Sequence, residues 1–223
     1  MIIIDNKAYK ITKLGDYSYS LYSKGGYKSQ IYSSLLKPDI LTSAFLDQRK
    51  NTIFFTAEIV QTLEDYLQSN KKMTEPECVK VIITLSTQIK YLEENNYVIY
   101  GYDLNDILVI NGNTFIIANS NYILPIQNNT FTFYDPNGFP YFSNPELINL
   151  TNLPTTIHYK SSYYSLGVLI TFLLTTKYLL VSKEIINDKS IEMILRPFFY
   201  SKIYWFLKRC FNKNCEQRVL LYI

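Results

Sequence analysis

The sequence predicts an α+β fold, in which a small β-rich part is followed by a mainly helical part. Near the start of the chain, Tyr17, Tyr19 and Leu21 alternate with serines, which is the period of a β-strand. Further on, apolar residues recur at helical spacing over 81–92, and the uncharged apolar run 163–176 predicts a buried helix. Because strands and helices segregate along the chain, an α+β arrangement is favoured over a parallel α/β sheet.

The β-rich part is expected to contain a hairpin. Residues 40–46 and 52–60 have the composition of strands, and the polar stretch 47–51 between them is typical of a turn. Gly25-Gly26 predicts a further turn, because glycine is the residue that most often marks one.

Two helix starts follow from capping signals. Thr62 precedes an acidic first turn, and Thr74 has Glu77 three positions on, which is the pattern of a capping box. The second helix should bury its apolar face and end near Asn95.

The second half of the chain begins with another predicted hairpin. Residues 107–110 and 114–118 are apolar, and the Asn-Gly pair at 111–112 between them is a strong turn signal. A loop is expected from there to about Ser143, and helices from Ser143 to the end.

Composition excludes some classes of function. The 223 residues carry a net charge of +3, which is too small to indicate a nucleic acid or an anionic membrane as partner. The basic residues Lys202, Lys208, Arg209 and Lys213 are interpreted as a solvated helix face. The longest apolar run is too short to span a bilayer, and the first residues do not form a signal peptide.

The skewed residue usage indicates the compartment and the genome more than the function. An odd number of cysteines, three, fits reduced thiols in the cytoplasm, and they lack the spacing of a zinc site. With 21 Tyr, 7 Gly and one His, the usage is that of an AT-rich genome.

Several short motifs follow one another in order along nearly the whole chain. They are 14–20 (Leu-Gly-Asp-Tyr-Ser-Tyr-Ser), 37–41 (Lys-Pro-Asp-Ile-Leu), Ala57-Glu58, 88–96, 99–109, 118–121 (Ala-Asn-Ser-Asn), 144–146 (Asn-Pro-Glu), 162–168 and 212–218. In this order they resemble a protein kinase, from its glycine-rich loop and hinge through the catalytic loop and metal-binding motif to the end of the large lobe. The resemblance implies a two-lobe fold, with a reduced β-rich N-lobe at 1–60 and a mainly helical C-lobe at 61–223.

The positions where a kinase carries its catalytic groups depart from the family pattern. Gly101 stands where the resemblance implies the catalytic aspartate, and Asp103 where it implies the loop lysine. Asn119 replaces the metal-binding aspartate, and it is a weaker ligand for magnesium. Asp106 replaces an asparagine and is the one candidate metal ligand, but phosphoryl transfer depends on several charged groups acting together.

The expected nucleotide-binding positions are also reduced. Gly15, Ala57 and Glu58 are the remaining candidates for cofactor contacts, whereas Tyr17 and Ser20 put side chains where phosphates need bare backbone. No bound cofactor is therefore expected.

The lysine–glutamate pair of an active kinase is missing as well. Glu58 is the first glutamate in the chain, so no earlier glutamate can pair with a lysine. Lys24 or Lys28 could imitate that lysine, but neither has this partner.

Two structural residues match the family pattern. The resemblance implies that Glu146 and Arg218, 72 positions apart, meet as a buried ion pair that anchors the segment before the central helix. No local feature of the sequence would otherwise bring them together.

Other catalytic groups are scarce. His158 is the only histidine, and a lone histidine is more often structural than catalytic. Asp103 and Asp106 are three positions apart, and a solvated loop pair is favoured over a metal site.

Three functions remain open. The first is an inactive kinase-like domain that binds a protein partner, as a scaffold, decoy or virion component; the composition resembles that of kinase-like proteins of giant DNA viruses, which implies the host cytoplasm or the virion. The second is an atypical serine/threonine kinase with relocated catalytic groups. The third is a nucleotide sensor without transfer activity.

Overall fold

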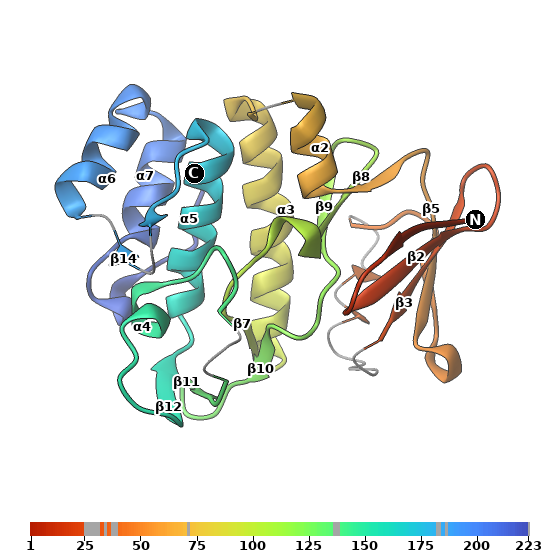
Figure 1. Cartoon of the computed structure of the whole chain (residues 1–223), viewed down its shortest axis with the longest axis horizontal. Coiled ribbons are helices and arrows are strands. Elements are labelled where there is room, and N and C mark those ends of the chain that lie inside the picture. Colours follow the sequence, from red (N-terminus) through yellow and green to blue (C-terminus); the bar gives the residue numbers. More distant parts are fainter. Residues whose placement is uncertain are drawn as a thin grey trace.

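The computed structural model describes residues 1–24, 32–33, 35–36, 40–70, 72–135, 139–181, 184–185 and 187–222. A five-stranded sheet forms one end of the molecule, and helices with small two- and three-stranded sheets form the rest (Figure 1). The chain is therefore a mixed protein of helices and small antiparallel sheets, which is compatible with the predicted α+β class.

The five-stranded sheet is entirely antiparallel and has the order β1-β2-β3-β5-β4. Its strands are β1 (Ile2–Asp5), β2 (Tyr9–Lys13), β3 (Ser18–Ser23), β4 (Phe45–Asp47) and β5 (Thr52–Thr56). The alternation predicted in this strand is confirmed in part: Tyr19 and Leu21 are buried and Ser18 is exposed, but Ser20 is buried, and Tyr17 is exposed and lies before the strand.

The predicted hairpin at 40–60 is only partly confirmed. Strands β4 and β5 pair across the 3-10 turn η1 (Gln48–Lys50), with Asp47 capping the turn. Residues 40–44 are not a strand, and a separate short strand, β6 (Val60–Thr62), follows β5. The predicted turn Gly25-Gly26, together with Lys28 and residues 37–39, lies outside the described residues.

Both predicted helix starts are confirmed. Helix α2 (Leu63–Asn70) begins after Thr62, whose Oγ1 accepts a hydrogen bond from Asp65 N at 3.0 Å. Helix α3 (Glu75–Glu94) has the full capping box, in which Thr74 N donates to Glu77 Oε2 at 2.7 Å. Its apolar face is buried, and it ends at Asn95 as expected.

The second hairpin is confirmed as β8 (Ile107–Ile110) and β9 (Thr114–Ile117), which pair with β6. Asn111 and Gly112 have φ of 52° and 67°, as this turn requires. Gln88 of α3 connects the helix to β9, because its Nε2 donates to Phe115 O at 2.7 Å and its Oε1 accepts from Ile117 N at 3.0 Å.

The region predicted to be loop and then helix contains additional short strands. Strand β7 (Tyr97–Ile99) pairs with β10 (Ile123–Pro125), and β11 (Thr130–Phe133) pairs with β12 (Thr155–His158). The expectation that everything after Ser143 is helical is therefore wrong for β12. Strand pairing between residues so far apart depends on tertiary contacts that no local pattern reports.

The remaining elements are mainly helical. They are α4 (Pro145–Ile148), α5 (Ser161–Thr175), the short pair β13 (Leu180–Val181) and β14 (Glu184–Ile185), α6 (Asp188–Leu195), η3 (Arg196–Phe198), α7 (Lys202–Cys210) and η4 (Cys215–Gln217). Helix α5 is buried on nearly all sides, as its apolar sequence predicts. Within the described ranges, no helix combines the length and the apolar composition needed to cross a membrane.

Two apolar cores meet along the β8–β9 hairpin. One core lies beneath the five-stranded sheet and includes Leu108 and Ile116, and the other lies among α3, α5 and α7 and includes Ile107 and Phe115. One face of the hairpin therefore packs into each core. The segments next to the hairpin border both parts of the molecule.

Candidate functional site

An open cleft of about 580 Å³ lies between the β1–β2 turn of the sheet and the segments next to the β8–β9 hairpin. The structure brings three predicted site residues to it, namely Asp103, Asp106 and Asn119. The other candidates do not line the cleft: they are Gly15, Ala57, Glu58 and Gly101.

Asp106 ends the 3-10 turn η2 (Leu104–Asp106) and is half-buried at the cleft wall. Burial raises the pKa of its carboxyl to about 6, although a hydrogen bond with Asn119 acts in the opposite direction. The backbone of this turn is held in place, since Ala118 N donates to Asp106 O at 2.9 Å. The prediction that Asp103 and Asp106 form a solvated loop pair is therefore wrong: both are half-buried, and both oxygens of Asp103 are hydrogen-bonded within the protein.

Asp103 is engaged in contacts that hold the segment before α4. Its Oδ2 accepts a hydrogen bond from Tyr122 OH at 2.7 Å, and its Oδ1 accepts one from Tyr141 N at 2.5 Å. Both carboxylate oxygens therefore have partners within the protein. A phosphate group in the cleft would meet the Asp103 carboxylate here, and not a basic side chain such as lysine.

Gly101 is buried beside the cleft under the segment that precedes α4. A Cβ atom added to it would lie 2.2 Å from Pro140 Cγ and 2.9 Å from the Phe142 carbonyl oxygen. Tyr102, the next residue, exchanges two backbone hydrogen bonds with Phe142, at 3.1 and 2.9 Å. The structure leaves no space at this position for a side chain.

Asn119 is buried, and its Oδ1 accepts a hydrogen bond from Asn121 N at 2.8 Å. Its amide is thus used to turn the chain after β9. Within the described residues, no group of three or more histidine, cysteine, aspartate or glutamate side chains is arranged to hold a metal ion. Asp106 and Asn119 form a hydrogen bond with each other at this wall of the cleft.

The 14–20 stretch, in which the resemblance implies a glycine-rich loop, does not border the cleft. It forms the β2–β3 turn, where Leu14 N donates to Ser18 O at 2.8 Å and the Tyr17 side chain is 63% exposed. The β1–β2 turn borders the cleft in its place. There Asn6 Oδ1 accepts hydrogen bonds from Ala8 N and Tyr9 N, both at 2.9 Å.

Sequence reasoning missed this turn, and with it Lys7 as a cleft residue. The available signal was the polar stretch Asn6-Lys7 between the apolar runs of β1 and β2. That signal predicts a turn but not its position over the cleft, because the position depends on how the sheet packs on the β8–β9 hairpin.

Lys24, directly after β3, has an acidic partner in the first strand. It forms an ion pair with Asp5 of β1, and its Nζ also donates to Asn6 O at 2.5 Å. Asp5 is an aspartate of β1 and not the glutamate that pairs with the lysine of an active kinase, so the prediction that Lys24 lacks that glutamate is not contradicted. The pair is partly exposed and fastens the β1–β2 turn, so it is not directed at the residues around η2.

The connection between β5 and β6 has its backbone donors already satisfied. Ala57 N donates to Tyr17 O at 2.9 Å, and Glu58 N and Ile59 N donate to Asn111 Oδ1 at 2.8 and 3.1 Å. These amides are therefore committed to internal contacts and are not available to a ligand in this conformation.

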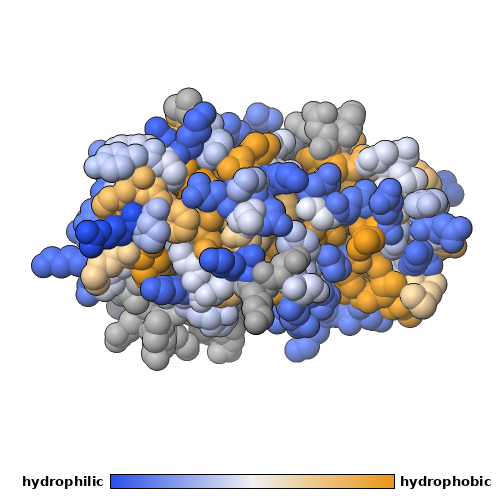
Figure 2. Space-filling view, turned by 90° about the horizontal axis from the view of Figure 1, so that it is seen from above, coloured by the Kyte–Doolittle hydropathy of each residue, from blue (hydrophilic) through white to orange (hydrophobic). Residues whose placement is uncertain are grey.

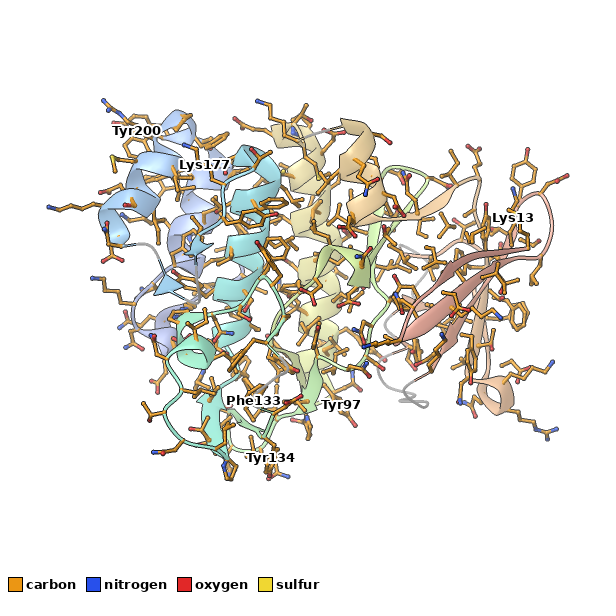
Figure 3. All side chains as sticks on the ribbon, in the orientation of Figure 1. Lys13, Tyr97, Phe133, Tyr134, Lys177 and Tyr200 are labelled. Carbon is orange, nitrogen blue, oxygen red and sulfur yellow. The ribbon has the colours of Figure 1, made fainter. Side chains whose placement is uncertain are left out.

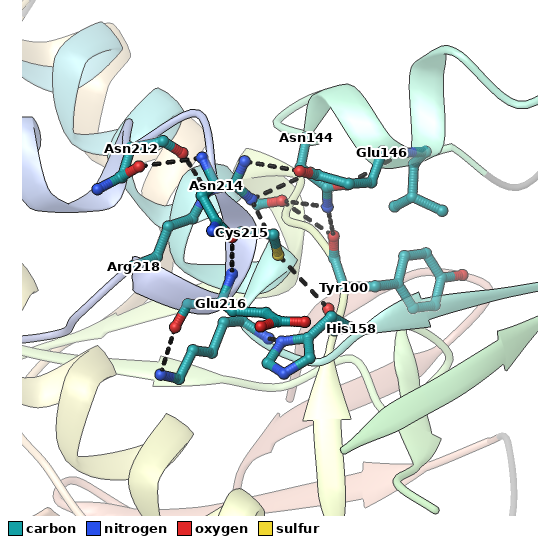
Figure 4. A network of polar contacts seen from close by, with 12 residues as sticks. Tyr100, Asn144, Glu146, His158, Asn212, Asn214, Cys215, Glu216 and Arg218 are labelled. Atoms are coloured by element: carbon teal, nitrogen blue, oxygen red, sulfur yellow. Dashed lines mark hydrogen bonds and ion pairs between the residues drawn. The ribbon is translucent and has the colours of Figure 1, made fainter. Parts of the chain in front are cut away.

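Glu146 and Arg218 meet as predicted. Arg218 Nη1 donates to Glu146 Oε2 at 3.0 Å and Nη2 donates to Oε1 at 2.6 Å, which is a bidentate arrangement (Figure 4). The arginine side chain is 1% exposed and the glutamate side chain 26%. His158 lies nearby, where its Nδ1 accepts a hydrogen bond from Lys160 N at 3.3 Å, so the histidine has a structural contact.

No protein-family model matches the chain, and no curated protein is significantly similar to it. The residues at the cleft are therefore interpreted from their own geometry. They combine one half-buried acid, one acid with both oxygens engaged, and an amide that turns the backbone.

Replacing Asp106 with asparagine is expected to change how stability depends on pH. Because its pKa is raised from 3.8 to about 6 in the folded protein, the folded state holds this proton more tightly than the unfolded state. Folding stability should then fall as pH rises from about 4 to about 6. Asp106→Asn should reduce this decline by on the order of 1–3 kcal/mol. The part that comes from Glu93, whose pKa burial raises to about 7, should remain.

Urea unfolding at several pH values measures this effect. Asp16→Asn is the matched control, because Asp16 is exposed in the β2–β3 turn. If both variants keep the decline of the unsubstituted protein, the burial of Asp106 is not its cause.

Proposed function

We propose that the chain is a kinase-like domain that does not transfer phosphate and acts by binding a protein partner. The resemblance of its ordered motifs supports the kinase-like part of the proposal. The skewed composition further supports an origin in a giant DNA virus, with a role as scaffold, decoy or virion component.

The observation that carries the proposal is the environment of Gly101. This residue stands where the motif of a kinase has its catalytic aspartate, and the added Cβ atom would overlap Pro140 and approach the Phe142 carbonyl oxygen at 2.9 Å. A carboxylate that orients a substrate hydroxyl has no room at this position. The segment before α4 therefore packs where the side chain of a catalytic aspartate would lie.

The charges at the cleft support the same conclusion. Phosphoryl transfer requires cationic groups and metal ions that neutralise phosphate oxygens. Among the described residues that line the cleft, Lys7 is the one basic residue, against three acids, Glu64, Asp103 and Asp106. Lys24, directly after β3, is already paired with an aspartate of β1. An arrangement of this kind disfavours a triphosphate at the position where transfer would occur.

A phosphotransfer assay tests the proposal. Incubation with labelled ATP, with magnesium or manganese, and with generic protein substrates is expected to give background incorporation, because the catalytic groups act as a unit and partial retention gives little rate. Asp106→Ala is the matched variant. Incorporation that the unsubstituted chain supports and the variant loses would overturn the proposal in favour of an atypical kinase.

Nucleotide binding without transfer is the second candidate, since the cleft of about 580 Å³ is in the size range of ligand sites. A thermal shift at millimolar Mg-ATP tests it. We expect a shift near zero, because the β5–β6 amides and Asp103 are already engaged. Stabilisation by about 2.7 kcal/mol, as for a ligand at a hundred times its Kd, would establish the sensor function instead.

A further inference from the structure

A second concave site lies on the side of the molecule away from the five-stranded sheet. It is a groove of about 660 Å³ between α4, α6 and α7, a volume in the range that binds ligands or inserted side chains. Its apolar walls are formed by Pro145, Tyr164, Ile191, Leu195, Tyr204 and Phe211. The Glu146–Arg218 ion pair also borders the groove.

A set of aromatic side chains continues the groove onto the surface of η3 and α7. We call Phe199, Tyr200, Tyr204 and Trp205 the aromatic ladder. Phe199 contacts Tyr204 with ring centres 4.8 Å apart, and Tyr204 contacts Trp205 at 5.3 Å. Because Tyr204 belongs to both the ladder and the groove wall, the two form one continuous surface.

The ladder is unusually exposed for aromatic residues. Tyr200 is 89% exposed and Trp205 49% exposed, and Tyr200 has a φ of 68°, which is uncommon for a bulky residue. Tyr200 lies at the helical end of the molecule (Figure 3), where Figure 2 shows apolar and hydrophilic side chains interspersed. Exposed tryptophan and tyrosine beside a pocket are typical of protein-binding surfaces.

The charge of this region indicates the partner. Residues 187–213 carry six Lys and Arg against two acids, a net charge of +4, whereas the whole chain carries +3. The two acids are already paired, Asp188 with Lys213 at 2.5 Å and Glu192 with Lys208 at 3.8 Å. The other four cations form no ion pair within the described part of the chain: they are Lys189, Arg196, Lys202 and Arg209.

This charge distribution refines the expectation of a merely solvated helix face. Lys202 and Lys208 are exposed as predicted, but Lys208 and Lys213 cross to α6 and fasten it to α7 and the turn after it. These two lysines stabilise the rim of the groove. Arg196 precedes Phe199 and Tyr200 in the sequence, Lys202 follows them, and both cations are exposed.

We propose that the groove and the aromatic ladder bind an acidic segment of a partner protein that inserts an apolar side chain between α6 and α7. The proposal rests on the proposed function, to which it adds the binding surface and the chemistry of the partner. The charges that line the groove are balanced in three pairs. The four cations of residues 187–213 that form no ion pair within the described ranges lie beside it on α6, η3 and α7, where they complement Asp and Glu of a segment that crosses the groove. A single-stranded nucleic acid would stack its bases on the exposed rings but leave the apolar groove unfilled. A membrane surface does not enter a concave groove.

Selection of short random peptides displayed on phage, with the full chain as bait, tests the proposal. The enriched peptides should combine Asp or Glu with a Leu, Ile or Phe. A synthetic peptide of this kind, free of tryptophan, should change the emission of Trp205, the only tryptophan in the chain. Tyr204→Ser should raise its Kd about tenfold or more, the effect expected for an aromatic residue at the centre of an interface.

A second variant distinguishes a loss of binding from a folding defect in Tyr204→Ser. Arg196→Glu with Lys202→Glu changes two exposed residues and should weaken the same peptide to a similar extent. The matched controls are Tyr134→Ser, 68% exposed in another part of the molecule (Figure 3), and Lys50→Glu with Lys90→Glu, which changes net charge equally. These controls should bind as the unsubstituted chain does.

Three results would overturn the proposal. They are enrichment of basic or uncharged peptides, equal weakening by the control variants, and binding of an oligothymidylate or of phosphatidylserine vesicles that the groove variants abolish. None of these outcomes alters the phosphotransfer result, so a failure of the docking surface is distinguishable from a failure of the proposed function.

Discussion

Replacing Arg218 with alanine is expected to lower the free energy of unfolding by about 3 kcal/mol, the low end of the cost of breaking a buried ion pair, because the Glu146 left behind is 26% exposed. Both nitrogens of its guanidinium fork bind Glu146, at 2.6 and 3.0 Å, and its Nε donates to Asn212 O at 2.9 Å. The guanidinium also lies 5.0 Å from the ring centre of Tyr164. One substitution would therefore remove contacts to α4, to α5 and to the turn after α7.

The size of this effect is large compared with the stability of a domain, which is about 5–15 kcal/mol. Arg218→Ala should consequently reduce soluble yield as well as the urea midpoint. Arg218→Lys should recover only part of the loss, because an ammonium group cannot make the same bidentate contact.

The choice of control depends on the structure. Arg209, which the sequence predicts to be exposed, is partly buried, and its Nη1 donates to Leu221 O at 3.0 Å. Arg49 is exposed in the turn between β4 and β5 and is the better match. Equal destabilisation by Arg49→Ala and Arg218→Ala would contradict the assigned role of the ion pair.

Features that depend on neighbouring residues could be predicted from the sequence. The capping box at Thr74 and Glu77 and the Asn111-Gly112 turn each involve a few adjacent positions, and both are present. The burial of α5 follows from its composition alone. Local signals fail at 40–44, where apolar residues pack against the sheet without joining it: Ile40 and Leu41 are buried but form no strand.

The candidate site could be predicted only in part, for a different reason. Asp103, Asp106 and Asn119 are close in space because the turn η2 and the segment after β9 adjoin the two ends of one hairpin. The other side of the cleft comes from the β1–β2 turn, which is about a hundred residues earlier in the chain. Packing between the two cores decides whether the β1–β2 turn or the β2–β3 turn faces η2. The sequence does not report this packing, so it predicts Gly15 of the β2–β3 turn as a site residue, and the structure places Gly15 outside the cleft.

Buried polar side chains were also missed. Asn144 is fully buried, and its Nδ2 donates to Tyr100 O at 3.1 Å and to Ser165 Oγ at 3.0 Å, while its Oδ1 caps α4 (Figure 4). The sequence identifies Asn144 only as the first residue of the Asn-Pro-Glu motif. A sequence does not report that an amide will have three partners, because two of them come from other elements.

Introducing an aspartate at position 101 is expected to destabilise the protein without creating phosphotransfer. The first atom of any side chain there would lie 2.2 Å from Pro140 Cγ and 2.9 Å from a backbone oxygen of Phe142. The backbone oxygen cannot rotate away as a side chain can, and it belongs to the bridge that joins Tyr102 to Phe142. Overpacking of this kind costs about 1–3 kcal/mol, and burial of a carboxylate adds to the cost.

Gly101→Ala separates the effect of size from that of charge, and Gly15→Asp is the matched control, because a Cβ at Gly15 meets only Ser18, at 3.9 Å or beyond. Urea midpoints should fall in the order Gly15→Asp, Gly101→Ala, Gly101→Asp, with only the first close to the unsubstituted protein. Labelled-ATP incorporation should stay at background for all three variants. A stable Gly101→Asp protein that transfers phosphate would contradict this prediction. It would mean that the segment before α4 moves aside readily, and that only the aspartate side chain, and not the space for it, is missing at position 101.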